Sequence, residues 1–457
     1  MSTILSYLSS LSPPQQIRLY HHPIIVLSFV KVLPSLHRSF LLRLLWFKKP
    51  IPLSAVKLWF SSHHQLNSVL HTLTALSFLV SDHNGIVLQP QVASAIRISF
   101  LNPSSITIPR STLPMDTISH SQLRFDTVIR LLTGELVSKS SRSTRKSIIK
   151  QEVDHESVSS TIASLLYSAD LSSTLPSTTT SAVITASGFR FLLTPRREQL
   201  WTLLVAVLRS FEDFNVVCDT LSFLFEISNN PTNSVFQATK SENPELNSVL
   251  IKFCGILDAL GLVVSTQLPN GNIGYVTTEM TELLLSSINH EQIFQHVNGH
   301  DDVSLFITVE TNFKIFVHSS DPLILSVLHL FLHVNHVLPG LICCSLSRES
   351  VTRAYQNGIT SDVIVNFLKH HARPSTLQRK EPIPKNVIEH ILLWESELSR
   401  IKSSECTLFF DFAEGVEVFD RCVVAAREAG AELLVDQVKR MLVVKAEKAS
   451  VVRNILG

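Results

Sequence analysis

The segment Leu305–Val317 constrains the fold most strongly, because it predicts two short β-strands that are apolar on both faces. A two-residue turn at Thr311-Asn312 would place Glu310 opposite Phe313. One face would then carry Phe306, Thr308, Phe313, Ile315 and Val317, and the other Ile307, Val309, Lys314 and Phe316. One face can pack on its own module. The second needs another cover, which could be more of this chain or a different protein.

A small α/β unit is predicted to follow this hairpin. Its expected elements are a helix from Pro322 that ends at Pro339-Gly340, a strand Leu341–Leu346, helices from Ser347 to Asn357-Gly358 and from Thr360 to Pro374, and a last helix from Pro384. The last helix is amphipathic and would place Val387, Ile388, Ile391, Leu392 and Leu398 on one side.

The stretch Pro322–Ser347 contains no Asp, Glu, Lys or Arg, which raises the question of a membrane span. Its helical part before Pro339 is too short to span comfortably, so a core helix followed by a strand is the favoured interpretation. His329, His333 and His336 stand at helical spacing and could form a metal-binding face. No carboxylate or thiolate completes a ligand set on that helix, which favours histidines at the solvent edge.

The charge distribution is uneven at the N-terminus. No Asp or Glu precedes Asp82, whereas seven basic residues do: Arg18, Lys31, Arg38, Arg43, Lys48, Lys49 and Lys57. Such asymmetry can indicate contact with nucleic acid or with an acidic protein surface. The basic residues do not cluster and no aromatic ladder accompanies them, which favours solvated helix faces with weak, non-specific DNA contact at most.

The six cysteines include no CxxC pair, so neither a disulfide framework nor a zinc site is predicted. The adjacent Cys343-Cys344 pair is expected to pack in a buried strand. The Ser/Thr-rich or polar stretches Asn102–His120, Ser138–Val158 and Leu171–Ser181 are expected to be loops or linkers. Arg142, Arg145 and Lys146 within one of them could serve as a weak nuclear-import or nucleic-acid patch, although a solvated linker is favoured.

Three segments of the first 290 residues follow a winged-helix plan of helices and a two-stranded wing. The first wing would be Phe78–Val80 and Ile86–Leu88 around Asp82–Gly85, and the third Leu260–Val264 and Gly274–Val276 around Pro269–Asn272. A less clear second wing would run from Ala182–Thr185 into Ser187–Leu192. Winged helices bind DNA in some proteins and only proteins in others, so this fold does not decide the function.

The last fifty residues predict a small α+β domain. Cys406–Phe412 would form a strand, Glu414–Ala429 a helix stopped by Gly430, and Leu433–Val435 with Met441–Val444 a hairpin before a short end helix. Three strands in so short a segment are marginal as an independent domain. An exposed edge here would allow another chain to add strands.

These segments together resemble a known family. Phe306–Lys314, Ser347–Val351, Asn357–Thr360, Phe367–Lys369 and the helix Pro384–Trp394 are similar to the fifty-two-kilodalton core subunit of the transcription and DNA-repair factor TFIIH. Leu19–Pro23, Leu33–Leu36, Ala55–Trp59, Ile184–Leu193, Gln199–Trp201 and Leu221–Phe225 resemble its N-terminal and middle parts. The charged tail of the family is absent after Met441–Val444.

The resemblance implies a fold and a set of partners. The fold would be mainly α with small β elements (α+β): winged-helix-like domains at 1–110, 120–195 and 196–290, a clutch module at 303–400 and a C-terminal heterodimerisation domain at 404–457. The clutch of that family binds an XPB-type helicase-translocase and stimulates its ATPase. The C-terminal domain binds a very small TFIIH subunit, and the N-terminal domains dock on other core subunits. The system served is RNA polymerase II transcription initiation and nucleotide excision repair in the nucleus.

Candidate contact residues follow from the pattern and the resemblance together. Those expected to contact the translocase are Ile307, Val309, Glu310, Asn312, Phe313, Lys314 and Phe316. Those expected at the small-subunit interface are Phe409, Phe410, Leu433, Val435, Met441, Leu442, Val443 and Val444. For the apolar residues, ordinary core packing is the alternative, and for Glu310 and Lys314 it is solvated surface.

Motifs of catalysis are missing from the sequence. It contains no GxxxxGK[ST], GxGxxG, HExxH or GxSxG pattern, so we expect a non-catalytic protein without cofactor, metal or membrane segment. A rival interpretation is a DNA-binding winged-helix regulator that acts through its basic N-terminal region. A second rival is a helicase-accessory protein that shares the clutch without joining TFIIH.

Overall fold

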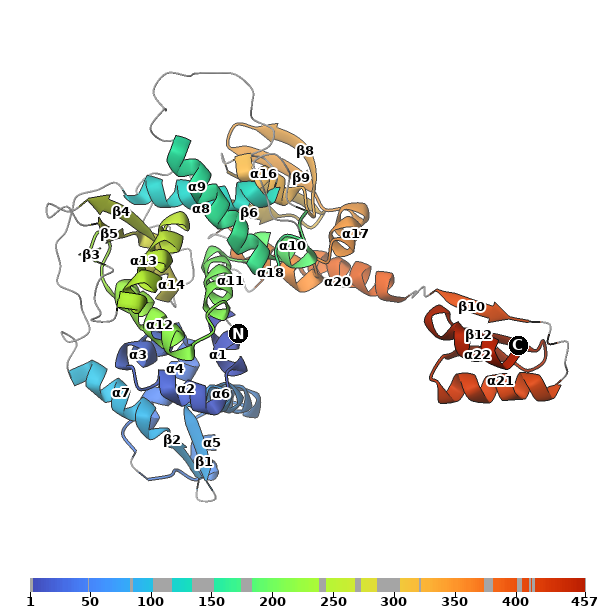
Figure 1. The fold of residues 1–457 in the computed structure, drawn as a ribbon. Coiled ribbons are helices and arrows are strands. Elements are labelled where there is room, and N and C mark those ends of the chain that lie inside the picture. Colours follow the sequence, from blue (N-terminus) through green and yellow to red (C-terminus); the bar gives the residue numbers. More distant parts are fainter. Residues whose placement is uncertain are drawn as a thin grey trace. The chain divides into compact units, whose positions relative to one another are not determined.

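The computed structural model describes residues 3–47, 49–82, 85–101, 117–133, 152–173, 183–237, 244–267, 273–285, 305–319, 322–373, 381–400, 405–410, 412 and 416–456. The predicted patch of Arg142, Arg145 and Lys146 and most of the three predicted linkers lie outside these residues. The chain divides into two compact units, Met1–Ile391 and Leu392–Gly457 (Figure 1). Most of the described elements are helices, and the sheets are small and antiparallel, which confirms the predicted mainly-α, α+β class.

The N-terminal part is a layer of short helices with one hairpin (Figure 1). Its elements are α1 (Thr3–Ser10), α2 (Pro13–Leu19), α3 (Pro23–Val32), α4 (Ser35–Leu44), α5 (Leu53–Lys57), α6 (His63–Ala75), β1 (Leu79–Asp82), β2 (Gly85–Leu88) and α7 (Pro90–Leu101). Proline stands at the first position of α2, α3 and α7, where its missing N–H leaves no helical hydrogen bond unmade. The Ser62 side chain accepts a hydrogen bond from the Gln65 N–H and caps α6.

The middle part adds longer helices around a second small sheet. Its elements are α8 (Thr117–Thr133), α9 (Glu152–Ser168), α10 (Ala186–Leu192), α11 (Arg196–Arg209), α12 (Phe214–Asn229), β3 (Val235–Phe236), α13 (Pro244–Ala259), β4 (Val263–Gln267), β5 (Ile273–Thr277) and α14 (Glu279–Leu285). One hydrophobic cluster holds buried residues from Ile4 to Leu285, so both parts share a continuous core. Trp201 lies fully buried within it and donates from Nε1 to the Leu284 carbonyl at 3.2 Å.

Two of the three predicted wings are present. β1 pairs with β2, and β4 pairs with β5, as the turn sequences predicted. The second predicted wing is wrong, because Ser187–Leu192 lies in α10. The hydroxyl of Thr185 accepts from the Gly188 N–H and starts that helix, so a Thr at the N-cap outweighs the β-prone residues before it. Thr117–His120 and Glu152–Val158, expected in linkers, are likewise helical.

Residues Leu305–Ile391 form what we call the four-stranded module. It contains β6 (Phe306–Val309), β7 (Lys314–His318), α16 (Pro322–Leu328), β8 (His333–Leu338), β9 (Leu341–Ser345), α17 (Arg348–Gln356), α18 (Ser361–His370) and the start of α20 (Lys385–Arg400). Its antiparallel sheet has the order β6-β7-β9-β8. Ser347 caps α17 and Thr360 precedes α18, as predicted.

The predicted helix from Pro322 is wrong beyond Leu328, because His333–Leu338 is the strand β8. Pro339-Gly340 is a hairpin turn between Leu338 and Leu341, with Gly340 at φ 73°, where Gly fits best. The three histidines therefore do not share a helical face, the arrangement that the disfavoured metal-site alternative required. His329, His333 and His336 are all exposed, which confirms the solvent-edge interpretation.

The C-terminal unit has its own small core. Its elements are β10 (Cys406–Phe409), α21 (Val416–Glu428), β11 (Glu432–Asp436), β12 (Met441–Lys445) and α22 (Ala449–Leu456), with sheet order β10-β12-β11. Phe412, Phe419, Cys422, Leu442 and Val444 are among the buried residues of that core. No helix in the described ranges is long and apolar enough to cross a membrane.

Candidate protein-binding surfaces

The β6–β7 hairpin has a three-residue loop instead of the predicted two. Glu310 N–H donates to the Lys314 carbonyl at 2.9 Å, and Phe313 N–H donates to the Glu310 carbonyl at 3.2 Å. Phe313 adopts the left-handed conformation, with φ 65°, and closes the turn. Glu310 therefore lies opposite Lys314 rather than Phe313, and this shift by one residue changes which side chains of β7 share a face with those of β6.

The observed register corrects the predicted faces. Ile307 pairs with Val317, and Val309 pairs with Ile315, so these four share the inner face of the sheet. Ile307 is only 1% exposed, which removes it from the candidate contact surface. Phe306, Thr308 and Phe316 lie together on the opposite face, since Thr308 pairs with Phe316.

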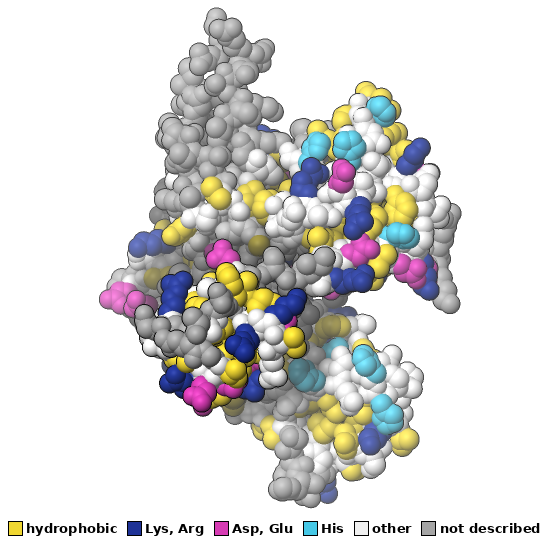
Figure 2. All heavy atoms as spheres, turned by 90° about the vertical axis from the view of Figure 1, so that its right-hand side faces the viewer, with side chains coloured by type: hydrophobic (Ala, Val, Ile, Leu, Met, Phe, Trp, Pro, Cys, Tyr) yellow, Lys and Arg dark blue, Asp and Glu magenta, His cyan; other side chains and the backbone are white. Residues whose placement is uncertain are grey.

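This opposite face, which we call the outer sheet face, extends across β9 and β8. Phe316 pairs with Cys343, which pairs with His336, and Leu338 pairs with Leu341 in the next row. The side chains of Phe306, Thr308, Phe316, Leu341 and Cys343 are all partly exposed, and Leu338 is 51% exposed. The inner face packs into the module, whereas the outer one keeps a mixed apolar and histidine surface open. Figure 2 shows hydrophobic and histidine side chains beside each other at the height of this module.

The hairpin loop is fixed by its own chain. The Phe313 ring meets the His390 ring edge-on, with centroids 5.1 Å apart, and Asn386 Nδ2 donates to the Thr311 carbonyl at 2.8 Å. Asn312 Oδ1 accepts from the Lys314 N–H at 2.9 Å. Phe313 is thus partly engaged with α20. Glu310, Asn312 and Lys314 remain exposed around it, so four predicted contact residues gather at one end of the hairpin.

The two edges of this sheet differ. Beside β6, the Ile307 N–H donates to the His371 carbonyl at 2.7 Å and the Arg373 N–H donates to the Ile307 carbonyl at 3.1 Å, so a following segment partly covers that edge. β8 is the other edge, and five of its six residues are exposed. It contains no charged residue, and an irregularity in its pairing lies at Asn335.

The C-terminal sheet also separates the predicted contact residues into two sets. Phe409, Val435, Leu442 and Val444 belong to the core under α21 and α22, and Leu442 and Val444 are fully buried. The register places Leu408, Val443 and Leu434 in one row on the other side. Phe410 is 67% exposed and Leu433 is 42% exposed, while Met441 and Val443 are partly exposed.

Sequence reasoning missed Leu408 and Leu434, which are 47% and 60% exposed. We call Leu408, Phe410, Leu434, Met441 and Val443 the C-terminal sheet face. Strict alternation along Leu433–Val435 and Cys406–Phe410 could have identified Leu434 and Leu408 as the outward partners of Val443. Figure 2 shows hydrophobic side chains among charged ones on the C-terminal unit.

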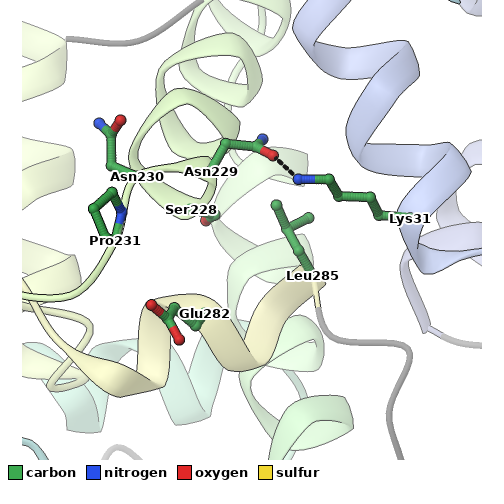
Figure 3. Close-up of a pocket in the computed structure, with 7 residues that line it drawn as sticks. All are labelled: Lys31, Ser228, Asn229, Asn230, Pro231, Glu282 and Leu285. Carbon is green, nitrogen blue, oxygen red and sulfur yellow. Dashed lines mark hydrogen bonds between the residues drawn. The ribbon is translucent and has the colours of Figure 1, made fainter. Parts of the chain in front are cut away.

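The chain also has a pocket of about 420 Å³ between α3, α12 and α14 (Figure 3). Lys31 reaches into it and donates to Asn229 Oδ1, and partial burial lowers the pKa of the Lys31 amine. Glu282 accepts from the Thr232 N–H at 3.2 Å, and the Ser228 hydroxyl donates to the Leu224 carbonyl. These groups are engaged in contacts within the chain, so the pocket holds no nucleophile paired with a base among its described lining residues.

Several buried thiols are poor nucleophiles at neutral pH. Burial raises the pKa of Cys344 to about 11, with a smaller contribution from Cys343, so this thiol stays protonated at neutral pH. Burial also raises the pKa of Cys218 to about 11 and of Cys254 to about 12. Within the described ranges, no three His, Cys, Asp or Glu side chains are grouped as a metal site would require.

Comparison with known proteins identifies the family. Residues 6–374 match the family model described as transcription factor Tfb2, and residues 389–456 match that of the transcription factor Tfb2 (p52) C-terminal domain. A Dictyostelium discoideum protein named general transcription factor IIH subunit 4 is 28% identical, with 100% of this chain and 99% of the relative aligned.

Two further relatives carry the name general transcription and DNA repair factor IIH subunit TFB2. The Candida glabrata protein is 25% identical over 97% of this chain and 95% of its own length. The Arabidopsis thaliana protein is 31% identical over 60% of this chain, an alignment that spans 57% of that relative. With family matches that cover most of its length, the chain belongs to the transcription factor Tfb2 (p52) family.

Proposed function

We propose that this chain is a non-catalytic core subunit of TFIIH that anchors an XPB-type DNA translocase and stimulates its ATPase. It would act in RNA polymerase II transcription initiation and nucleotide excision repair in the nucleus. Membership of the Tfb2 family and the TFIIH names of its relatives support the complex.

The exposure of the outer sheet face is the observation that best supports the proposed translocase contact. This face combines Phe306, Phe316 and Leu341, which are partly exposed, with the exposed Leu338 on four adjoining strands. Apolar side chains that stay accessible next to each other across a sheet often mark a site where a partner binds. The hairpin loop with Glu310, Asn312 and Lys314 would contribute polar contacts at the rim, and Val309 and Phe313 would support the loop from inside.

The anchoring role explains how a protein without catalytic groups could accelerate ATP hydrolysis. A translocase closes its two lobes around the nucleotide, and a rigid module bound to one side can favour the closed arrangement. The loop contacts of Phe313, Asn312 and Thr311 keep the hairpin rigid, so little conformational freedom would be lost on binding.

The C-terminal sheet face would bind the small TFIIH subunit. Leu408, Leu434 and Val443 form its central row, and the two helices of the unit cover only the opposite side. A partner with a sheet of its own could cover this row, or extend the sheet at the β10 or β11 edge.

The test of the translocase contact is the variant Phe316→Glu in a quantitative pull-down with the purified translocase. A carboxylate in the middle of the outer sheet face should weaken binding by about 2 kcal/mol or more, since an anchoring aromatic would be lost and a charge desolvated. Val337→Glu is the matched control, because Val337 is 59% exposed on the same sheet but pairs with the inner-face residue Ile342. Unchanged binding by a folded Phe316→Glu chain would refute this assignment.

A further inference from the structure

The N-terminal part carries an exposed apolar surface that no contact proposed above uses. Trp46 is 81% exposed, Leu58 is 86% exposed and Phe47 is 49% exposed. The Phe47 and Trp59 rings lie with centroids 5.9 Å apart, which brings the segments before and after α5 together. We call Arg43, Trp46, Phe47, Lys49, Lys57 and Leu58 the Trp46–Leu58 surface. The lower part of Figure 2, which holds the N-terminal helices, shows hydrophobic side chains beside a basic one at the surface.

This surface is held rigidly from beneath. The buried Phe40 ring contacts Trp59 at 5.9 Å and Phe60 at 5.4 Å between centroids. Val56, in the middle of α5, is fully buried. The exposed position of Leu58 is therefore a consequence of a packed helix rather than of a loose loop.

The connection between α4 and α5 is fixed at two points. Ile51 exchanges backbone hydrogen bonds of 3.0 and 2.9 Å with Ile86 of β2, and Arg97 donates to the Leu45 carbonyl at 2.7 Å. Gly85 permits the first contact, because a Cβ there would lie 2.1 Å from the Ile51 carbonyl oxygen. The β1–β2 hairpin thus fixes the backbone near Trp46. Because this backbone is already ordered, little conformational entropy would be lost there on binding.

The charged residues that belong to this surface are all basic. Arg43, Lys49 and Lys57 are exposed, and the Arg43 guanidinium lies 6.0 Å from the centre of the Trp59 ring. The sequence of residues 1–81 contains no Asp or Glu. A partner with a complementary surface would therefore carry acidic residues at the rim of that surface and apolar residues at its centre.

We propose that the Trp46–Leu58 surface docks a folded protein that offers an apolar groove bordered by Asp and Glu. Trp and Arg are the residues most enriched among those that dominate protein interfaces. Leu58 argues against nucleic acid, because an aliphatic side chain cannot stack on bases and only loses water against phosphates. This inference rests on the proposed function, because the candidate partners are taken from TFIIH. They are the core subunits other than the translocase and the small subunit bound by the C-terminal unit.

The test measures binding of each purified core subunit to the full-length chain, with wild type compared with a Trp46→Ser/Leu58→Ser double variant. One subunit should lose affinity by about 30-fold or more, while translocase binding stays unchanged. Ile251→Ser on α13 is the matched control, since Ile251 is an exposed apolar residue, 47% exposed, remote in sequence. All of these positions are exposed, so thermal unfolding should be unaltered, and it is recorded for each variant.

A charge-reversed variant, Lys49→Glu/Lys57→Glu, gives an independent readout. The variant should bind the same subunit with about tenfold lower affinity at low salt. The loss of affinity should be much smaller at about 1 M salt, where charges are screened. Equal binding by wild type and the Trp46→Ser/Leu58→Ser variant would overturn this inference alone, whereas a wild-type chain that binds no core subunit would contradict the proposed function too. Loss of binding to a duplex oligonucleotide, with subunit binding intact, would overturn the protein-docking inference in favour of DNA.

Discussion

At the residue scale, Gly358 joins two parts of the first unit. It adopts φ 80° between α17 and α18, and a Cβ there would lie 2.6 Å from the Cβ of Ala186 on α10. Its carbonyl also accepts a 2.6 Å hydrogen bond from Arg190 Nε. The four-stranded module and α10 can approach this closely only because residue 358 has no side chain.

We expect Gly358→Ala to destabilise the chain by about 2–4 kcal/mol, from left-handed strain together with the clash against Ala186. Gly430→Ala is a control with the same backbone demand and no clash, since its φ is 60° and nothing lies within 4 Å of its added Cβ. It should cost about 1 kcal/mol. Calorimetric unfolding measures both, and equal losses would show that the contact with Ala186 is unimportant.

Glu198 provides a pH-sensitive contact at the N-terminus. Burial alone would raise its pKa, but hydrogen bonds from the Thr3 N–H at 2.7 Å, the Thr3 hydroxyl at 2.8 Å and Arg197 outweigh burial and lower the pKa below 4.5. A carboxyl with a lowered folded-state pKa stabilises the fold above its unfolded value and loses that contribution as the pH falls through the folded value. The docking of α1 on α11 should therefore weaken only below about pH 4.5.

The corresponding variant is Glu198→Gln, which we expect to lower stability by about 1–2 kcal/mol at pH 7 and by progressively less as the pH falls below 4.5. The measurement is thermal unfolding of wild type and variant across that range. A difference between the two proteins that grows towards low pH would contradict the assigned direction of the pKa shift.

Single residues were harder to predict from the sequence than patterns. Phe313 is the main example, because a bulky aromatic rarely adopts positive φ and no local rule favours a three-residue loop closed by Phe. Its conformation depends on His390 and Asn386, about seventy-five residues later in the chain. The three-residue loop sets the hairpin register, and with it whether Phe316 shares a face with Phe306 or with Ile307.

At the scale of elements, short local signals predicted the helix ends well. Ser347, Thr360 and the Asn357-Gly358 stop have the expected positions, because caps and left-handed glycines depend only on neighbouring backbone groups. The same logic failed at Pro339-Gly340, since this dipeptide ends helices and also makes hairpin turns. Only pairing of β8 with β9 decides between the two, and pairing partners are not visible in a local pattern.

The C-terminal sheet face gives a prediction for one strand. Leu434→Glu should reduce binding of the small TFIIH subunit by about 2 kcal/mol or more, because this 60% exposed side chain lies beside Val443 in the centre of the face. Val424→Glu serves as control, since Val424 is 55% exposed on α21, which covers the opposite side. Isothermal titration with the purified small subunit measures the difference, and full affinity in the Leu434→Glu chain would exclude this face.

At the scale of the whole molecule, the chain combines two units with separate cores. Buried residues from Ile4 to Leu285 form one cluster, and the C-terminal unit has its own. The fold class and the family could be predicted from the sequence, because both depend on patterns spread along the chain. The five-part domain division stays a prediction, and the shared core of the first 285 residues arises from long-range packing that composition does not encode.

If the outer sheet face engages an XPB-type translocase productively, this chain should raise the ATPase rate of the purified translocase when it is titrated in. Wild type should raise the rate to a saturating plateau, and Val337→Glu should do the same. Phe316→Glu should leave the rate near that of the translocase alone across the same concentrations. Equal stimulation by Phe316→Glu and wild type would exclude the outer sheet face as the stimulating contact, and no stimulation by wild type would exclude a role as ATPase activator.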